Sequence, residues 1–256
     1  MRYFVNEDSI VRKIWSSSDT ILFIFAGSSA EFALNKAVDW LYFTGKLPAD
    51  PIGRLFSTVS YAQQIVFSEY DTAISTIDKI SAIHKNVEQT RGAKIPDWAY
   101  RDVLFMLIDY SIRSYELLQR RLSENEKEEV FQIFYQMGKQ MDLTGLPSNF
   151  SEWSIMRVEH LQRNLEVGKF TINLYEQYKR HLGFFRYNLL LQAQKLVVPP
   201  RVNYLLKLGK VDWLIPVLQF YKFMRIIKVE FVLKRIILPK KYIQQILDLD
   251  RPISSQ

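Results

Sequence analysis

Apolar residues recur every three or four positions along most of the chain, and strand-like alternation is confined to the weak stretch Lys195–Val198. Spacing of this kind places the apolar side chains on one face of a helix. No fixed-period repeat or low-complexity segment interrupts the pattern. The pattern therefore predicts an all-α fold built as a single large helical bundle-like domain.

Start and stop signals divide this pattern into separate helices. Asp50-Pro51 combines a capping residue with proline at the first helical position, and Ser123-x-x-Glu126 is a capping box. We expect one or two helices before Pro51. Beyond it, we predict helices over residues 51–68, 71–87, 97–119, 123 to about 145, 151–167, 171–194, 202–208 and 212–238, and a last one after Pro239.

The C-terminal quarter carries the excess positive charge of the molecule. Residues 195–251 contain 12 Lys or Arg and only 4 Asp or Glu, in a chain whose net charge is +7. Within residues 212–241 the cations alternate with Phe, Ile and Val, which favours contact with a membrane surface or a partner over binding to nucleic acid. The alternative is a core helix with snorkelling cations. We divide the chain into a helical domain, residues 1–198, and basic amphipathic helices packed on it, residues 199–256.

The composition excludes several kinds of chemistry. The 256 residues include no cysteine, so disulfides, zinc–thiolate sites, iron–sulfur clusters and thiol nucleophiles are excluded. Glycine-rich phosphate-binding motifs and serine-hydrolase motifs are also missing. Glu7 and Asp8 stand where the apolar part of a signal peptide would lie, and no run of 18 apolar residues occurs. We therefore expect a cytoplasmic protein. Any peripheral contact with a membrane is expected to be made by residues 212–241.

His84 is the first candidate for a functional residue. At helical spacing it shares a face with Ile77, Ile80 and Val87, which is the face expected to point into the core. A histidine held there is suited to ligate a metal or a haem iron as neutral imidazole. The alternative is a packed histidine with one hydrogen bond to a backbone carbonyl. The other two histidines, His160 and His181, have charged neighbours in the sequence and are predicted to lie on exposed faces.

Further candidates are polar residues in apolar surroundings. Arg54 and Thr58 are four residues apart with Ser57 between them, so all three project from one face of an otherwise apolar helix. They could line a cavity in which the arginine meets a carboxylate or a bound oxygen species, or they could face solvent. Asp109 follows an apolar run and needs a cationic partner, which Arg54 or Arg113 could supply.

The order of these motifs resembles the MpaB/latex-clearing rubber oxygenase catalytic-domain family over about residues 15–245. Asp50–Thr58 resembles the D-P-x-x-R-L-x-x-T segment of the family, and Ile83–Val87 resembles its I-H-x-x-V. Leu107–Glu116 is similar to the L-V-D-S…Y-E segment, and Leu122–Glu126 to the L-S-x-x-E that follows it. Leu238-Pro239 fits a C-terminal L-P.

The resemblance implies a haem b-dependent oxygenase that uses O₂ to oxidise or cleave an apolar, isoprenoid or lipid-like small molecule. His84 matches the proximal iron ligand, which would make it the metal-binding residue. Arg54 and Thr58 match polar residues beside the haem and would orient a propionate or the oxygen. Ser57 stands where a rubber oxygenase lysine can cap the iron. Asp109 matches a recurrent acidic residue, expected to hold the arginine or a ring nitrogen.

The chain also departs from the family pattern. Relatives have His-Pro where this chain has Gly27-Ser28, and a histidine where it has Leu104. The leading hypothesis, which rests on the resemblance, is still a haem-dependent oxygenase. A second is a non-catalytic helical protein that binds haem or an apolar ligand and associates peripherally with membranes, and a third is a helical scaffold in which His84 is merely packed.

Overall fold

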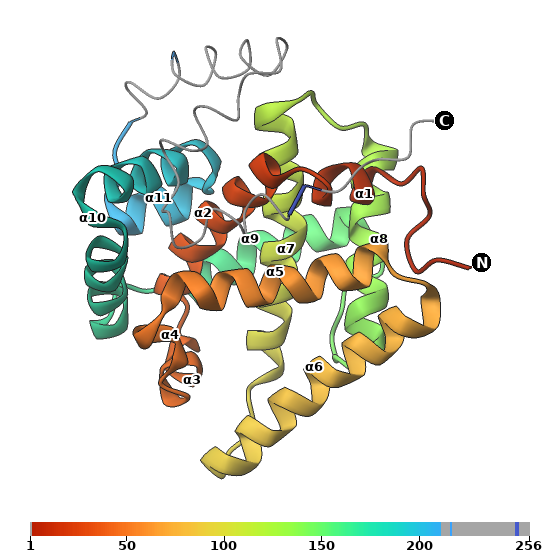
Figure 1. The fold of residues 1–256 in the computed structure, drawn as a ribbon, viewed down its shortest axis with the longest axis horizontal. Coiled ribbons are helices and arrows are strands. Elements are labelled where there is room, and N and C mark those ends of the chain that lie inside the picture. Colours follow the sequence, from red (N-terminus) through yellow and green to blue (C-terminus); the bar gives the residue numbers. More distant parts are fainter. Residues whose placement is uncertain (1, 211–215, 217–248, 251–256) are drawn as a thin grey trace.

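The computed structural model describes residues 2–210, residue 216 and residues 249–250 (Figure 1). Within these residues the regular structure is helical, apart from two isolated bridges, Tyr3 to Glu69 and Asn35 to Leu165. The predicted all-α fold is therefore confirmed. The helices predicted over residues 212–238 and after Pro239 lie outside the described residues, as does most of the proposed part 199–256.

Eleven helices follow one another along the described chain. They are α1 (Ile10–Trp15), α2 (Ser18–Leu34), α3 (Val38–Phe43), α4 (Lys46–Ala49), α5 (Pro51–Phe67), α6 (Tyr70–Arg91), α7 (Asp97–Leu118), α8 (Glu124–Gln140), α9 (Phe150–Arg163), α10 (Lys169–Val197) and α11 (Pro200–Leu206).

Several helix ends form as the sequence predicts. The carboxylate of Asp50 accepts a hydrogen bond from the backbone N–H of Gly53 at 3.0 Å, which caps α5. Ser123 and Glu126 form the predicted capping box at the start of α8. Helix α6 differs from the prediction over 71–87, because it runs from Tyr70 to Arg91 and stops at Gly92, which has a φ of 70°. Glycine takes this left-handed conformation readily, so it stops the helix cleanly.

Two further predictions about helix limits are wrong. The segment before Pro51 holds four helices instead of one or two. The side chains of Ser9 and Ser17 cap two of them, and the residues between Trp15 and Ser18 separate α1 from α2. Helix α8 ends at Gln140 instead of near residue 145. The chain leaves the helix because Asp142 adopts a left-handed φ of 56°.

Helix α2 lies inside the molecule, packed against α7 and α10 (Figure 1). Apart from Asp19 and Glu31, its side chains are small or apolar on every face, and most of them are buried. A helix without a polar face can be satisfied only by neighbours all round. The main core joins it to large side chains of α1, α5, α7 and α8, among them Trp15, Ile65, Phe105, Phe131 and Phe134.

Helix α10 is sharply bent at Gly183, where φ is 71° and ψ is 170°. The hydroxyl of Tyr175 donates to the side-chain oxygen of Gln194 at 3.0 Å, although nineteen residues separate them. A straight helix would hold these positions about 28 Å apart. The two halves of α10 therefore fold back on each other, with Gly183 at the corner. Among the described residues, no helix has the length and apolar character needed to cross a membrane.

Candidate functional site

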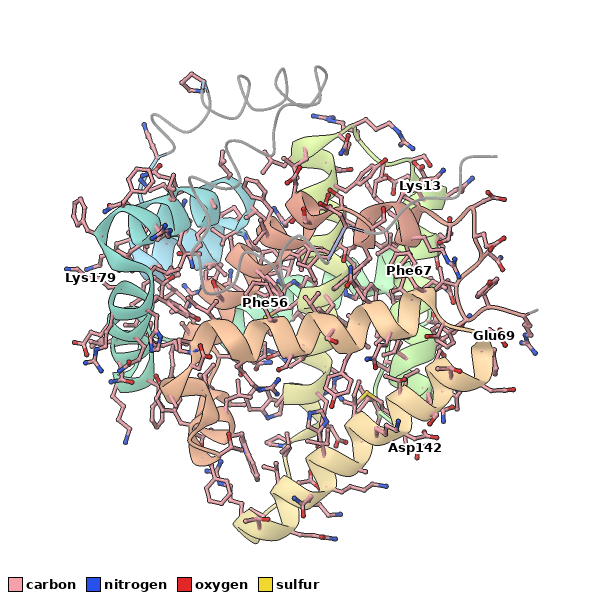
Figure 2. The ribbon with its side chains drawn as sticks, viewed as in Figure 1. Lys13, Phe56, Phe67, Glu69, Asp142 and Lys179 are labelled. Atoms are coloured by element: carbon pink, nitrogen blue, oxygen red, sulfur yellow. The ribbon has the colours of Figure 1, made fainter. Side chains whose placement is uncertain are left out.

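Helices α5 and α6 form a V, and the predicted site residues lie along its two arms. The arms diverge from the turn between Phe67 and Glu69, and α7 passes behind them (Figure 2). Arg54 lies on α5 and His84 on α6, each about 20 Å along its helix from that turn. The fold therefore places the arginine and the histidine at similar distances from the turn, on the two arms of the V.

Arg54 is largely buried, and its hydrogen bonds stay within its own helix. Its Nη1 donates to the hydroxyls of Ser57 and Thr58, both at 3.1 Å. Those hydroxyls donate in turn to the carbonyl oxygen of Arg54, at 2.8 and 3.2 Å. Burial lowers the pKa of Arg54 below its ordinary value, with a small opposing effect from Tyr61. Among the residues that the structure describes, the guanidinium makes no ion pair, and its printed hydrogen bonds go to Ser57 and Thr58.

His84 is half-buried, and its Nδ1 atom is buried without a hydrogen-bond partner among the described residues. Burial, together with the nearby charge of Arg54, lowers the pKa of His84 from 6.5 to about 4, although Glu88 acts in the opposite direction. The imidazole is therefore neutral at neutral pH, with a free nitrogen lone pair for a metal or a free N–H. A histidine satisfied by a backbone carbonyl, the alternative interpretation, is not what the described contacts show.

Two residues that the sequence analysis missed complete the surroundings of His84. The ring of Tyr100, on α7, meets the imidazole edge to face with 5.1 Å between ring centroids. The Tyr100 hydroxyl donates to Glu88 at 3.1 Å, and the same carboxylate oxygen accepts from the backbone N–H of Ile95. Glu88 lies one helical turn after His84, which could have identified it. Tyr100 gave no such signal, because the contact depends on how α6 and α7 pack.

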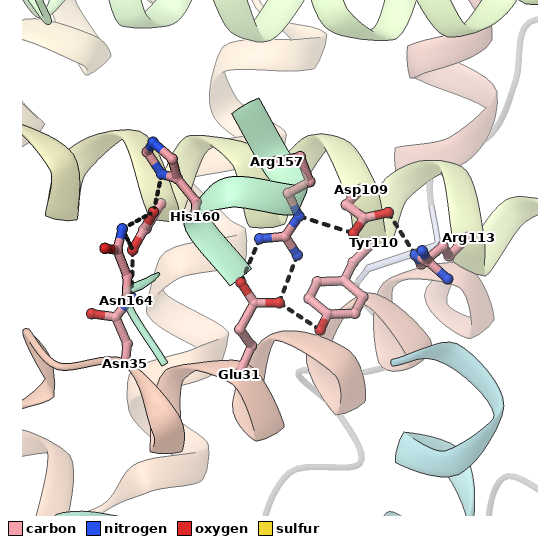
Figure 3. A network of polar contacts seen from close by, with 9 residues as sticks. Glu31, Asn35, Asp109, Tyr110, Arg113, Arg157, His160 and Asn164 are labelled. Carbon is pink, nitrogen blue, oxygen red and sulfur yellow. Dashed lines mark hydrogen bonds and ion pairs between the residues drawn. The ribbon is translucent and has the colours of Figure 1, made fainter. Parts of the chain in front are cut away.

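Asp109 lies in a different polar network, at the junction of α2, α7 and α9 (Figure 3). One carboxylate oxygen accepts from Arg113 at 2.6 Å, which confirms the predicted pair, and the other accepts from Arg157 at 3.0 Å. Arg157 also binds Glu31 through two bonds of 2.5 and 2.6 Å. Asp109 therefore holds neither Arg54 nor an imidazole nitrogen in the described structure. Two arginines satisfy its charge without a cofactor.

The prediction that His160 lies on an exposed face is wrong. Its ring is 12% exposed, and its Nδ1 is hydrogen-bonded to the carboxylate of Asp102, which also accepts from Asn35 and Asn164 (Figure 3). His160 lies three residues after Arg157, so both point toward α7. Of the charged neighbours that suggested exposure, Arg157 is itself buried, whereas Glu159 and Arg163 are exposed. His181 is half-buried on α10.

A comparison with known protein families identifies the chain. Residues 18–231 match the family described as ER-bound oxygenase mpaB/B′/rubber oxygenase, catalytic domain. This chain belongs to that family. The match spans both arms of the V, and the family description indicates an oxygenase. No curated protein and no solved structure matches the chain.

The two positions where members of the mpaB/rubber oxygenase family have histidine are core positions here. A Cβ atom on Gly27 would lie 2.2 Å from the ring of Tyr110, so that ring fills the space beside the glycine. Leu104 is 5% exposed and packs within the main core, close to Gly138. Ser57, at the position of the family lysine, is hydrogen-bonded to Arg54. His84 is therefore the histidine that remains available at this site.

One small cavity lies elsewhere, between the end of α2 and the start of α10, with a volume of about 50 Å³. None of the predicted site residues contributes to it. Its lining residues are Ala33, Leu34, Asn35, Lys36, Val38, Glu166, Gly168, Phe170 and Thr171. A space of this size accommodates one or two water molecules. It is therefore unrelated to the site between α5 and α6.

Proposed function

We propose that this chain is a haem b-dependent oxygenase of an apolar substrate, with His84 as the iron ligand. The observation that carries the proposal is the buried Nδ1 of His84, which has no hydrogen-bond partner among the described residues, near an arginine that makes no ion pair with any of them. A buried polar atom without a partner is costly, and it commonly marks the place of a group that the protein has yet to bind.

The residues present fit a haem. A neutral imidazole is the form of histidine that binds iron, and burial keeps His84 in that form at neutral pH. A haem carries two propionates, and the Arg54 guanidinium, which makes no ion pair with any described residue, is suited to bind one of them. When bound, the haem iron supplies the chemistry of O₂ activation.

The chain's own residues would hold and orient the ligands of the site. Tyr100 packs against the His84 ring and restricts its rotation, because its hydroxyl is fixed on Glu88. Ser57 and Thr58 fix the direction of the Arg54 guanidinium. Ser57 offers a hydroxyl and no nitrogen, so it would orient Arg54 and would not act as a second ligand of the iron.

The apolar substrate is part of the proposal and is supported by the family description, which names a rubber oxygenase. Rubber is an isoprenoid hydrocarbon polymer without charged groups. On the α5 arm, Phe56 meets Phe25 of α2 edge to face at 5.7 Å, so aromatic side chains stand close in sequence to Arg54. An apolar ligand would find van der Waals contacts there.

The first test is an absorption spectrum of the protein purified with haem supplied. We expect the wild type to show a haem Soret band, and His84→Ala to lose it. His181→Ala is the matched control, because it removes another half-buried histidine from a distant helix, and it should keep the band. Circular dichroism confirms that each variant is folded. A wild type that takes up no haem, or an unchanged band in His84→Ala, would refute the assignment.

A second measurement separates an oxygenase from a protein that only binds haem. The protein that only binds haem is favoured by the absence of the family histidines at Gly27 and Leu104, which are core positions here. Oxygen consumption by the haem-loaded protein is followed with a reductant and an isoprenoid oligomer. Uptake that depends on the oligomer supports the oxygenase. Haem binding without any oligomer-dependent uptake supports the binding protein.

A further inference from the structure

The corner of α10 exposes two consecutive phenylalanines. Phe184 is 79% exposed and Phe185 is 60% exposed, directly after Gly183. The backbone angles of Gly183 lie in a region that only glycine occupies without strain, so the corner depends on this residue. Exposing two large aromatic side chains side by side is unfavourable in water, and such patches commonly mark contact sites.

The corner is held in place by contacts below it, so the phenylalanines are not free to turn inward. Tyr175 bonds Gln194 across the bend, and Gln194 donates to Ser29 of α2 at 3.1 Å. Tyr178 lies in the first half of α10 and Tyr187 in the second, and both belong to a second apolar cluster with residues of α2, α3 and α4. The fold therefore holds Phe184 and Phe185 in fixed, exposed positions at the corner of α10.

Cations predominate in the sequence on both sides of the corner, although Glu176 is exposed three residues before Lys179. Lys179 and Arg180 are exposed about one helical turn before Phe184, and Figure 2 shows Lys179 extending from the outer edge of α10. Residues 177–210 contain no Asp or Glu, whereas they contain seven cations: Lys179, Arg180, Arg186, Lys195, Arg201, Lys207 and Lys210. The chain on both sides of the corner is therefore complementary to an anionic surface.

We propose that this corner docks on a lipid bilayer that contains anionic lipid. Phe184 and Phe185 would enter the boundary between headgroups and acyl chains, while Lys179 and Arg180 contact lipid phosphates. Apolar rings at the tip with cations one turn behind suit a surface that is anionic outside and apolar beneath. A nucleic acid would satisfy the cations but would leave the rings in water unless bases stacked on them.

This docking site is separate from the membrane contact expected of residues 212–241, and it does not depend on haem binding. It can therefore hold even if the proposed function fails. The test is co-sedimentation with phosphatidylcholine vesicles, with and without phosphatidylserine. We expect the wild type to bind the anionic vesicles, and to release them as salt is raised. Phe184→Ser/Phe185→Ser should weaken this binding by about tenfold or more.

The matched control is Ile155→Ser/Val158→Ser on α9, which removes two side chains of similar exposure, 63% and 59%. We expect this variant to bind like the wild type. Equal binding by the Phe184→Ser/Phe185→Ser variant and the wild type, or no binding of the wild type to anionic vesicles, would overturn the proposal. So would a dimer or a nucleic-acid complex that needs the phenylalanines while vesicles are ignored.

The cysteine-free chain permits a direct test of insertion. Phe185→Cys and Ile155→Cys each provide one thiol for a fluorophore that brightens in an apolar environment. We expect anionic vesicles to increase the emission at position 185 severalfold and to leave that at position 155 unchanged. An unchanged signal at position 185 in vesicle-bound protein would show that another part of the chain makes the contact.

Discussion

Arg157 is buried between two carboxylates, with only 5% of its side chain exposed. It binds the carboxylates of Glu31 and Asp109, and the Tyr110 hydroxyl donates to Glu31 at 2.8 Å. The two acids and the arginine come from three different helices. An ion pair of this kind is costly to bury, but it is still more costly to break, because removing one partner leaves the others charged in a dry interior.

We predict that Arg157→Met lowers the free energy of unfolding by about 3–5 kcal/mol, because Glu31 and Asp109 lose their buried cation. The measurement is denaturation by urea, followed by circular dichroism. Arg113→Met is the control: Arg113 bonds the same aspartate, but its side chain is 39% exposed, so we expect a loss of about 1 kcal/mol or less. Equal losses in the two variants would contradict this account.

The residues of the candidate site were partly predictable. Arg54, Thr58 and His84 stand out in the sequence because each is polar at a position with apolar neighbours, and the structure places the arginine close enough to affect the histidine. Tyr100 could not be found in this way, because its contact with His84 depends on the packing of α6 and α7. His160 was misjudged, because charged neighbours in sequence do not fix which face of α9 is buried.

At the scale of elements, α2 shows where periodicity loses its power. An amphipathic helix such as α5 can be recognised in the sequence by its repeating apolar face. Helix α2 has no polar face, so its apolar positions show no such repeat. The pattern therefore predicts fewer helices before Pro51 than the four that form. The small residues of α2 allow neighbouring helices to approach closely. Gly27 lets α2 approach α7 so closely that the Tyr110 ring lies against its backbone.

Gly27→Ala should lower the free energy of unfolding by about 1–3 kcal/mol, because the new methyl group would lie 2.2 Å from Tyr110. This net loss is expected even though alanine favours a helix over glycine by about 1 kcal/mol. Thermal or urea unfolding measures the change. Gly168→Ala is the control, since nothing lies within 4 Å of a Cβ there. A Gly27→Ala variant at least as stable as the wild type would show that α2 and α7 can move apart freely.

At the scale of the whole molecule, the sequence predicted the fold class and most helix positions, but not which helices meet. Helix periodicity shows which face of a helix is buried and leaves open what covers it. The contact between α2 and α10 joins segments more than a hundred residues apart, and the bend at Gly183 that allows it lies inside a predicted continuous helix. Glu31 and Arg157 are similarly distant in sequence, so their pairing could not be predicted.

Haem binding should stabilise the whole molecule if the proposed function is correct. A ligand at about 100 times its dissociation constant adds about 2.7 kcal/mol, which should raise the Tm of a chain of this size by about 5 °C or more. Differential scanning calorimetry at increasing haem concentration measures the shift. We expect a rising Tm for the wild type and a constant one for His84→Ala. A similar rise in both would indicate haem binding elsewhere on the protein.

The way in which Arg54 is held has a consequence for how a guest could enter. Its side-chain hydrogen bonds are made to Ser57 and Thr58 of the same helix, and among the described residues no side-chain hydrogen bond joins α5 to α6. In the described residues the two arms are therefore held together by packing contacts and not by side-chain hydrogen bonds. Between α5 and α6, therefore, no described side-chain hydrogen bond opposes the entry of a broad, flat molecule, and Ser57 and Thr58 already orient the Arg54 guanidinium on its own helix.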